Sequence, residues 1–326
     1  MYKLDLKNRK ILHELDKDCR QSFNQIGRKV NLSKNAVRYR IALMKKVGVI
    51  KKFHTLINIG KLGYIGFRIY INLQNTTPKK EKEIIDYLKT KANVTWIASM
   101  DVLYNLGIFV VAKNISEVHG LWDDLMERYI NYFDDRSLTI ITHSNYFSIG
   151  YLVDLERSDY EISTTTPQDP DIDDTDRRIV AMLAENADIA IVKIAHKLGF
   201  SSKTIIQRIK NMEKKNVIVA YKTFLDFEKL GYQHFKVSFI LSKVTKPKER
   251  EFRQYAKYHP NIVYEENYIG GDDVELGIHV KDNTHLRKIL DEIKERFSDI
   301  IHDHRILQIY EEHKNSYFIG DIGKKE

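Results

Sequence analysis

The sequence predicts an α+β protein made of two copies of one two-domain unit. Three features indicate this: the chain repeats itself at a spacing of about 168 residues, each copy starts with short amphipathic helices, and each continues in alternating strands and helices. The 326 residues suggest two to four domains, and the 43% hydrophobic content is sufficient for packed cores. The formal net charge of +8 favours a polyanionic partner such as nucleic acid.

Residues 1–60 have the pattern of three short helices followed by a strand. Asp5 is a suitable N-cap for the first helix. Ser22, with a glutamine three residues later, forms the capping box that predicts the second helix. Ser33 is a good N-cap for the third helix, and Gly48 should end it. An apolar alternation then predicts a strand or wing.

The third helix should separate an apolar stripe, formed by Val37, Ile41 and Met44, from a polar face. Cations on such a face can neutralise phosphates, and Arg38 and Asn35 can reach base edges. Two helices of this kind form a helix-turn-helix, although a solvated Lys-rich surface is the simpler alternative. The residues expected to contact DNA in this half are Lys34, Asn35, Arg38, Tyr39, Arg40, Lys45, Lys46, Lys51 and Lys52. Arg40, like Arg208 in the second half, lies beside the apolar stripe and is expected to brace the fold or touch phosphate rather than read bases.

The next ninety or so residues predict a ferredoxin-like βαββαβ domain. The expected strands and helices are a strand at 64–73, a helix opened by Thr77-Pro78, strands around 94–99 and 103–112, a helix around 117–129 and a strand around 138–147. Helices cover one face of such a sheet. The other face must be buried, and pairing with a second copy would bury it.

The second copy begins at Ile172, where Ile172-Asp173 corresponds to Leu4-Asp5. Farther along, we align Leu106-Gly107-Ile108 with Leu276-Gly277-Ile278. The polar, Pro-containing segment between the copies predicts a linker. The expected domains are a winged helix-turn-helix at 1–60, a ferredoxin-like effector or assembly domain at 61–152, the linker at 153–171, a second winged helix-turn-helix at 172–231 and a second ferredoxin-like domain at 232–320.

The repeated pattern resembles the Lrp/AsnC, or feast/famine, family of transcription regulators. The residues that carry this resemblance in the first half are L-D-x-x-[DN], LS-x-x-x-V-x-x-R-I-x-x-[LM], G-V-I and L-G. The second half repeats the pattern with departures, such as Asn216 in place of Gly48. The resemblance implies a covalently linked pseudo-dimer that binds double-stranded DNA and associates further into homo-oligomers. It implies no cofactor and no enzymatic activity.

The family often carries a Gly and an Asp between the second and third sheet strands, where amino-acid effectors bind. The resemblance therefore implies an effector site in the second half at Gly270, Gly271, Asp272 and Asp273. The first half offers only Asp101 after Ser99-Met100, so one effector site is expected to be lost.

The second recognition helix should also contact DNA, but more weakly than the first. Residues 1–60 carry 15 Lys and Arg against four acids, whereas residues 172–231 carry 11 against eight. Because phosphate contacts dominate affinity, the first module should supply more of the binding energy. A second module retained only for packing is the alternative. The residues expected to contact DNA in the second half are Ser202, Lys203, Gln207, Arg208, Lys210 and Lys214.

Two other functions remain open from the sequence. Sirohaem decarboxylases share this two-domain architecture, and Tyr104-Asn105-Leu106 is faintly similar to part of their ligand domain. A small-molecule sensor that has lost DNA binding is the other alternative. A metal site is not expected, because His302 and His304 alone make a weak signal. One cysteine, Cys19, and the lack of a signal peptide or long apolar run predict a cytoplasmic protein.

Overall fold

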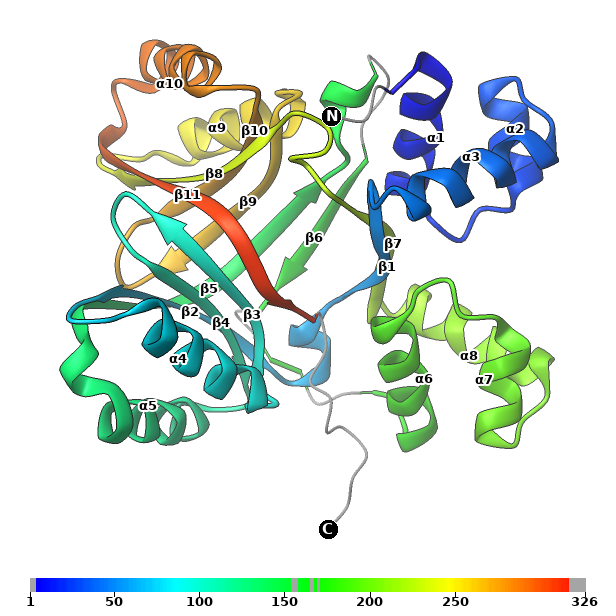
Figure 1. Ribbon diagram of the computed structural model, residues 1–326, viewed down its shortest axis with the longest axis horizontal. Helices are drawn as coiled ribbons and strands as arrows, with labels where there is room; N and C mark the ends of the chain where they lie inside the picture. The colour runs from blue at the N-terminus through cyan, green and yellow to red at the C-terminus, as the bar shows by residue number, and fades with distance from the viewer. Residues whose placement is uncertain (1–3, 154–157, 165–166, 169–170, 317–326) are drawn as a thin grey trace.

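The first half of the chain starts with three helices and a strand, as its caps predict (Figure 1). The structure is a computed structural model that describes residues 4–153, 158–164, 167–168 and 171–316. Ser22 and Gln25 form the reciprocal capping box, and Ser33 accepts a hydrogen bond from the Ala36 amide. The elements are α1 (Leu6–Lys17), α2 (Phe23–Val30), α3 (Lys34–Lys46) and β1 (Ile50–Ile57).

The βαββαβ order follows, so the predicted α+β class is confirmed. Strand β5 begins earlier than the apolar pattern predicts, because exposed polar residues at 134–136 follow Phe133 in a stretch that already pairs with β2. The elements are η1 (Ile59–Leu62), β2 (Ile65–Leu73), α4 (Pro78–Thr90), β3 (Val94–Asp101), β4 (Leu106–Ala112), α5 (Ile115–Tyr129), η2 (Ile130–Tyr132), β5 (Phe133–Phe147) and η3 (Gly150–Leu152).

The second half repeats this order, and the end of its last predicted domain, from 317 onward, lies outside the described residues. The segment expected to be a linker contributes one strand, β6 (Asp159–Ser163), which pairs with β5. The remaining elements are α6 (Asp174–Glu185), α7 (Ile191–Leu198), α8 (Ser202–Lys214), β7 (Ile218–Leu225), β8 (Gln233–Leu241), α9 (Lys246–Tyr258), β9 (Ile262–Ile269), β10 (Val274–Val280), α10 (Asn283–Phe297) and β11 (Ile301–Asn315).

The two ferredoxin-like units pair within the chain and close into a ring of strands. The nine-stranded sheet has the order β2-β4-β3-β11-β8-β10-β9-β5-β6, and an additional pairing of β2 with β5 closes the ring. Two antiparallel pairings cross between the halves, β3 with β11 and β5 with β9. Helices α4 and α5 cover the outside of the first unit, and α9 and α10 cover the second (Figure 1).

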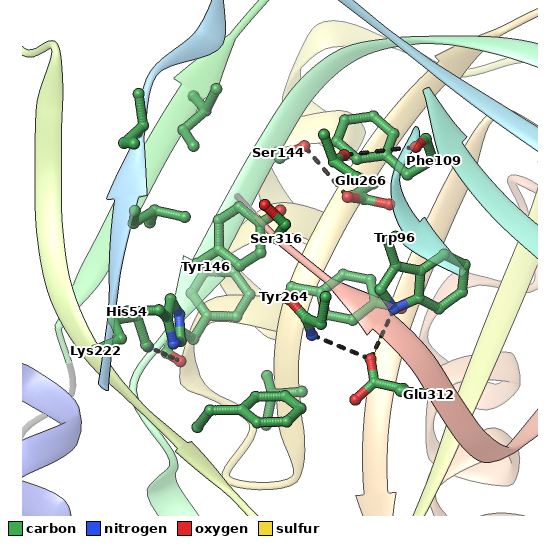
Figure 2. A pocket seen from close by; sticks show the side chains of 18 of the residues that line it. His54, Trp96, Phe109, Ser144, Tyr146, Lys222, Tyr264, Glu266, Glu312 and Ser316 are labelled. Atoms are coloured by element: carbon green, nitrogen blue, oxygen red, sulfur yellow. Dashed lines mark hydrogen bonds between the residues drawn. The ribbon is translucent and has the colours of Figure 1, made fainter. Parts of the chain in front are cut away.

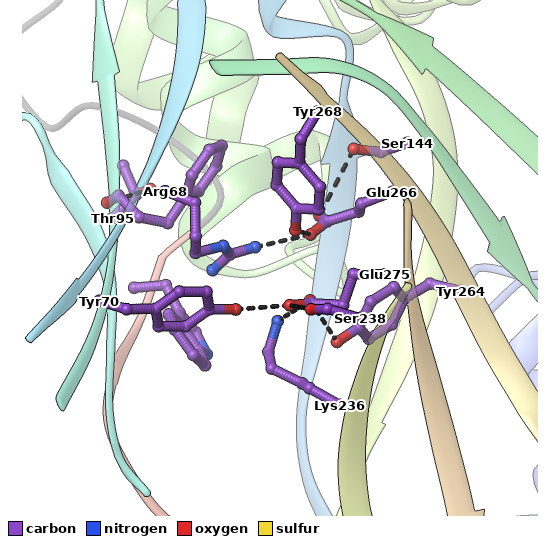
Figure 3. A network of polar contacts seen from close by, with 12 residues as sticks. Arg68, Tyr70, Thr95, Ser144, Lys236, Ser238, Tyr264, Glu266, Tyr268 and Glu275 are labelled. Atoms are coloured by element: carbon purple, nitrogen blue, oxygen red, sulfur yellow. Dashed lines mark hydrogen bonds and ion pairs between the residues drawn. The ribbon is translucent and has the colours of Figure 1, made fainter. Parts of the chain in front are cut away.

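The inside of the ring holds buried charges. Arg68 and Glu266 form one ion pair at 2.8 Å, and Lys236 and Glu275 form another at 2.5 Å. Figure 3 shows the two pairs close together, with Arg68 and Tyr70 of the first half reaching toward Glu266 and Glu275 of the second. Burial alone would lower the pKa of Arg68, but Glu266 and the other acidic groups around it together outweigh burial and raise that pKa.

The strand predicted after α3 is not a separate wing, because β1 pairs with its own copy, β7. The two strands form an antiparallel ribbon in which Phe53 lies opposite Thr223. The ribbon lies between the three-helix modules in Figure 1. Among the described helices, none combines the length and apolar character that crossing a membrane requires.

Candidate nucleic-acid interface

One hydrogen bond latches each three-helix module onto the ribbon strand of the other half. The Thr55 hydroxyl in β1 donates to the Leu183 carbonyl in α6 at 2.7 Å. The Thr223 hydroxyl in β7 donates to the Leu15 carbonyl in α1 at 2.9 Å. Both threonines are buried, and the apolar side chains of both modules belong to one continuous core. Helices α3 and α8 are therefore held as a pair on the two sides of the ribbon (Figure 1).

Helix α3 has the two faces that its sequence predicts. Val37, Ile41 and Met44 are buried in the core of the modules. Arg38 is exposed, and Tyr39 is 69% exposed beside it. The other exposed residues of this face are Lys34, Asn35, Ala42, Lys45 and Lys46. The face offers cationic, amide and phenolic groups to solvent, as a helix that enters a DNA groove requires.

Arg40 and Arg208 hold the recognition helices in place. The Arg40 guanidinium donates to Asp5 at 2.6 Å and to the side-chain oxygen of Asn8 at 2.8 Å. In the second half, Arg208 donates to Asp173 at 2.8 Å and to Asp176 at 2.9 Å. Each Arg thus ties its helix to the N-terminal cap of the first helix in the same module. These bonds fit the expected role of bracing the fold, so we treat both residues as positioning residues.

Three lysines expected to contact phosphate also have partners within the chain. Lys45 lies 3.4 Å from Asp188 and 4.2 Å from the centre of the Phe53 ring. Lys51 lies 3.7 Å from Asp226. Lys52 is half-buried, its ammonium donates to the Asn315 carbonyl, and burial lowers its pKa. The charge of Lys52 is therefore directed toward β11 rather than toward solvent.

Helix α8 presents a smaller polar face. Ile205, Ile209 and Met212 are buried, while Lys203, Gln207, Lys210 and Lys214 are exposed and Ser202 is half-exposed. The Gln207 amide donates to the Asn211 side chain at 3.0 Å. Both side chains lie on the exposed surface of the helix, where they can offer hydrogen bonds to a base. The face remains less basic than that of α3.

The β9–β10 turn, the expected effector site, has the backbone that its glycines allow. Gly270 and Gly271 both have positive φ, 82° and 125°. Asp272 lies 3.1 Å from the Arg305 guanidinium, and Asp273 accepts a hydrogen bond from the Leu241 amide at 2.7 Å. Burial raises the pKa of Asp272. Both carboxylates therefore have partners within the chain.

The strand register corrects the alignment of the two halves near this turn. Gly107 lies opposite Tyr70, and Glu275 lies opposite Ser238. The spacing therefore stays at about 168 residues, and Gly107 corresponds to Glu275 rather than to Gly277. Matching the two identical Leu-Gly-Ile runs shifted this strand by two residues. A two-residue shift keeps each side chain on the same face, so the alternation of apolar residues did not reveal the error.

The corrected alignment also moves the first-half turn. Asn105 accepts from the Leu73 amide at 2.7 Å, which is the counterpart of the bond between Asp273 and Leu241. Asp101, expected to contact an effector, therefore corresponds to Ile269 and lies outside the equivalent of the Gly-Gly-Asp-Asp turn.

Comparisons with known proteins agree with two helix-turn-helix modules. A family described as "AsnC-type helix-turn-helix domain" matches residues 4–45, and one described as "Winged helix-turn-helix DNA-binding" matches residues 172–219. The chain is 32% identical over 126 residues to a proline dehydrogenase transcriptional activator of Rhodobacter capsulatus, covering 37% of this chain and 79% of that protein. It is 32% identical over 117 residues to an uncharacterized HTH-type transcriptional regulator of Pyrococcus horikoshii, covering 35% of this chain and 72% of that protein.

A solved structure is similar over nearly the full length. The siroheme decarboxylase NirDL covers 96% of this chain with 94% of its own, at a TM-score of 0.61 and 13% sequence identity. At this identity the likeness shows the shared fold alone.

The fold and the exposed helix faces define a tandem helix-turn-helix protein whose modules are carried on paired ferredoxin-like domains. The matched families and the identity to the relatives also show which family the chain belongs to. The chain belongs to the Lrp/AsnC family of helix-turn-helix transcriptional regulators.

Proposed function

We propose that this protein is a sequence-specific DNA-binding transcriptional regulator that acts as a covalent pseudo-dimer. The observation that supports this best is the ribbon with its two threonine latches, which holds α3 and α8 as a pair. Paired recognition helices read two half-sites about one helical turn apart, roughly 34 Å. In most such dimers the two readers are identical. Here they differ in sequence, so the preferred site is an imperfect palindrome.

The two helices contribute unequally to the proposed binding. Arg38 and Asn35 on α3 can form paired hydrogen bonds with guanine and adenine, and Gln207 on α8 can do so with adenine. The residues proposed for phosphate or base contacts are Lys34, Asn35, Arg38, Tyr39, Lys45, Lys46 and Lys51 in the first half, and Ser202, Lys203, Gln207, Lys210 and Lys214 in the second. Arg40, Arg208 and Lys52 are omitted because they are half-buried as well as bound within the chain, whereas Lys45 and Lys51 are exposed.

Selection from a random duplex pool, followed by fluorescence anisotropy, tests the proposal. We expect an enriched site with two unlike halves and an affinity that falls steeply with salt, since each neutralised phosphate contributes about −0.9 to the slope of log K against log salt. A flat salt dependence and no enriched sequence would support the sensor without DNA binding.

Replacing Arg38 by Ala should weaken binding to the selected site by about 1–3 kcal/mol and relax the base preference in one half-site. The reason is that a guanidinium on the exposed face of α3 can form paired hydrogen bonds with guanine. Anisotropy titrations with the selected and a random duplex measure the effect. Arg287→Ala, at an exposed position of α10, is the matched control. An equal loss on both duplexes would mean that Arg38 contacts phosphate only.

Effector control and further association remain predictions. An amino acid bound at Gly270, Gly271, Asp272 and Asp273 would have to compete with Arg305 for a carboxylate or bind through the turn backbone. Differential binding of such a ligand to two arrangements of the modules would couple it to DNA. Calorimetry with the common amino acids tests this point directly.

A tetrapyrrole enzyme is the second candidate. What favours it is a chamber beside the ribbon that contains three histidines, His54, His234 and His279. Against it, the chamber volume of about 180 Å³ suits one or two rings and not a macrocycle. The visible spectrum of the purified protein distinguishes the two functions, because a bound tetrapyrrole absorbs strongly there.

A further inference from the structure

The chamber lies where the ribbon meets the ring of strands (Figure 2). The ribbon contributes His54 from β1 and Lys222 from β7, and the ring contributes Trp96, Tyr264 and Glu312, among others. Figure 2 shows these side chains around a common space. A molecule bound there would contact both the ribbon, which lies between the three-helix modules, and the ring, which joins the two halves.

The size of the chamber limits what it can hold. Its volume is about 180 Å³. An engineered apolar cavity of about 150 Å³ is known to bind benzene, so this chamber fits a molecule of one or two rings. Aromatic rings of Trp96, Tyr146, Phe224 and Tyr264 line it, and they favour a flat aromatic guest.

The charges of the lining disfavour an ionic guest. The three cations of the described lining are already paired: Arg68 with Glu266 at 2.8 Å, Lys236 with Glu275 at 2.5 Å, and Lys222 with Asp16 at 3.4 Å. An added anion would have to break one of these pairs. An added cation would lie beside the three cations, and the Glu312 carboxylate of the lining already accepts a hydrogen bond from the Trp96 indole at 2.7 Å. Taking an unpaired ion out of water is costly, so an uncharged molecule is preferred.

Two histidines of the lining have hydrogen-bonding capacity left. The Nε2 atoms of His234 and His279 are buried and have no hydrogen-bond partner among the described residues. The two rings lie 4.8 Å apart, and the Nδ1 atom of His279 lies 2.8 Å from the Tyr151 hydroxyl. Burial lowers the pKa of both histidines, so they are neutral at pH 7 and can accept a hydrogen bond.

We propose that the chamber binds a small, uncharged aromatic molecule of one or two rings that carries an N–H or O–H group for His234 or His279. Because it would contact both ribbon and ring, such a ligand would also bias the arrangement of α3 and α8. This second effect rests on the proposed function.

Isothermal titration calorimetry of the full chain with indole tests the binding. We expect saturable binding of one molecule per chain, at least tenfold tighter than that of 1-methylindole, which has no N–H. Benzoate and benzylamine, as charged aromatic probes, should bind at least tenfold more weakly than indole. Absence of saturation with indole up to millimolar concentration, or equal affinity for all four probes, would overturn the proposal.

Two variants locate the site. Val263→Phe adds a ring at a half-buried lining position and should reduce indole affinity at least tenfold, whereas Val244→Phe, at an exposed loop position, should not change it.

His234→Phe keeps a ring but removes one acceptor, and together with His279→Phe it should abolish the preference for indole over 1-methylindole. Unfolding curves establish that each variant is folded. Unchanged affinity in Val263→Phe, or a preserved preference in the double variant, would refute the site.

The same ligand separates binding from regulation. Indole should shift the affinity for the selected DNA site severalfold in the wild-type chain and not in Val263→Phe. Calorimetric binding with no shift would refute the regulatory effect and leave the ligand site intact. A chain that binds indole but no DNA would refute the proposed function instead.

Discussion

Replacing Glu275 by Gln is expected to lower the free energy of unfolding by about 3–5 kcal/mol, because the change leaves a buried cation without its partner. Glu275 is fully buried and accepts hydrogen bonds from Lys236 at 2.5 Å and from the Tyr70 hydroxyl at 2.6 Å (Figure 3). Burial alone would raise the pKa of Glu275, but the attraction of Lys236 and Arg68 outweighs it and keeps the carboxylate ionised. Glutamine preserves the shape and removes the charge, so the loss reports on the charge.

Urea unfolding followed by tryptophan fluorescence measures this effect. Glu83→Gln is the control: its ion pair with Lys80 is also short, 2.7 Å, but its side chain is 51% exposed, so the expected change is only about 0–1 kcal/mol. Replacing Glu275 and Lys236 together by Leu and Met should restore much of the loss. A change below about 1 kcal/mol for Glu275→Gln would show that the network is not the buried, ionised cluster that we infer.

The same network supports pairing of unlike halves. Lys236 is the counterpart of Arg68, but the counterparts of the acids Glu266 and Glu275 are Ala98 and Gly107. Two first halves would therefore bury arginines without acids, and two second halves would bury four acids against two lysines. Only a first half with a second half balances the charge. This requirement favours the proposed pseudo-dimer over symmetric association of like halves.

Local signals in the sequence were sufficient for the modules. The capping residues Ser22 and Ser33 and the stripe of α3 depend on neighbours within one or two turns, and the structure has them as predicted. The partners of Arg40 lie 32 and 35 residues away and could not be read from helix periodicity. Thr55 and Thr223 could have been noticed in the sequence, because the same residue type occupies matching positions of the two copies.

The ring and the chamber could not be predicted, because they depend on contacts across the halves. Strand alternation places Arg68 and Tyr70 on one face of β2, but it does not tell a solvated face from the inside of a closed ring. The chamber lining comes from strands of both halves, so no single stretch of sequence contains it. The register of β10 was misjudged for the same reason: pairing with β8, not local identity, determines it.

Lowering the pH from 7 to 5 is expected to destabilise the protein by about 2 kcal/mol for each histidine that is neutral when folded, which follows from an unfolded pKa near 6.5 and 1.36 kcal/mol per pKa unit. His54 is 5% exposed, and burial, assisted by Lys222 and Lys52, lowers its pKa to about 3. His279 is 1% exposed, and burial, assisted by His234, lowers its pKa well below the ordinary value.

The sign follows from proton binding. Below pH 6.5 the unfolded chain takes up a proton at each of these positions, while the folded chain does not do so until far lower pH, so folding becomes less favourable as pH falls. Urea unfolding at pH 7 and pH 5 measures the difference. His54→Phe should reduce the pH-dependent loss by about 2 kcal/mol whatever it does to stability at pH 7. His119→Gln, at a 71% exposed position, should leave the loss unchanged, and an equal loss in all three proteins would mean that other groups control the acid response.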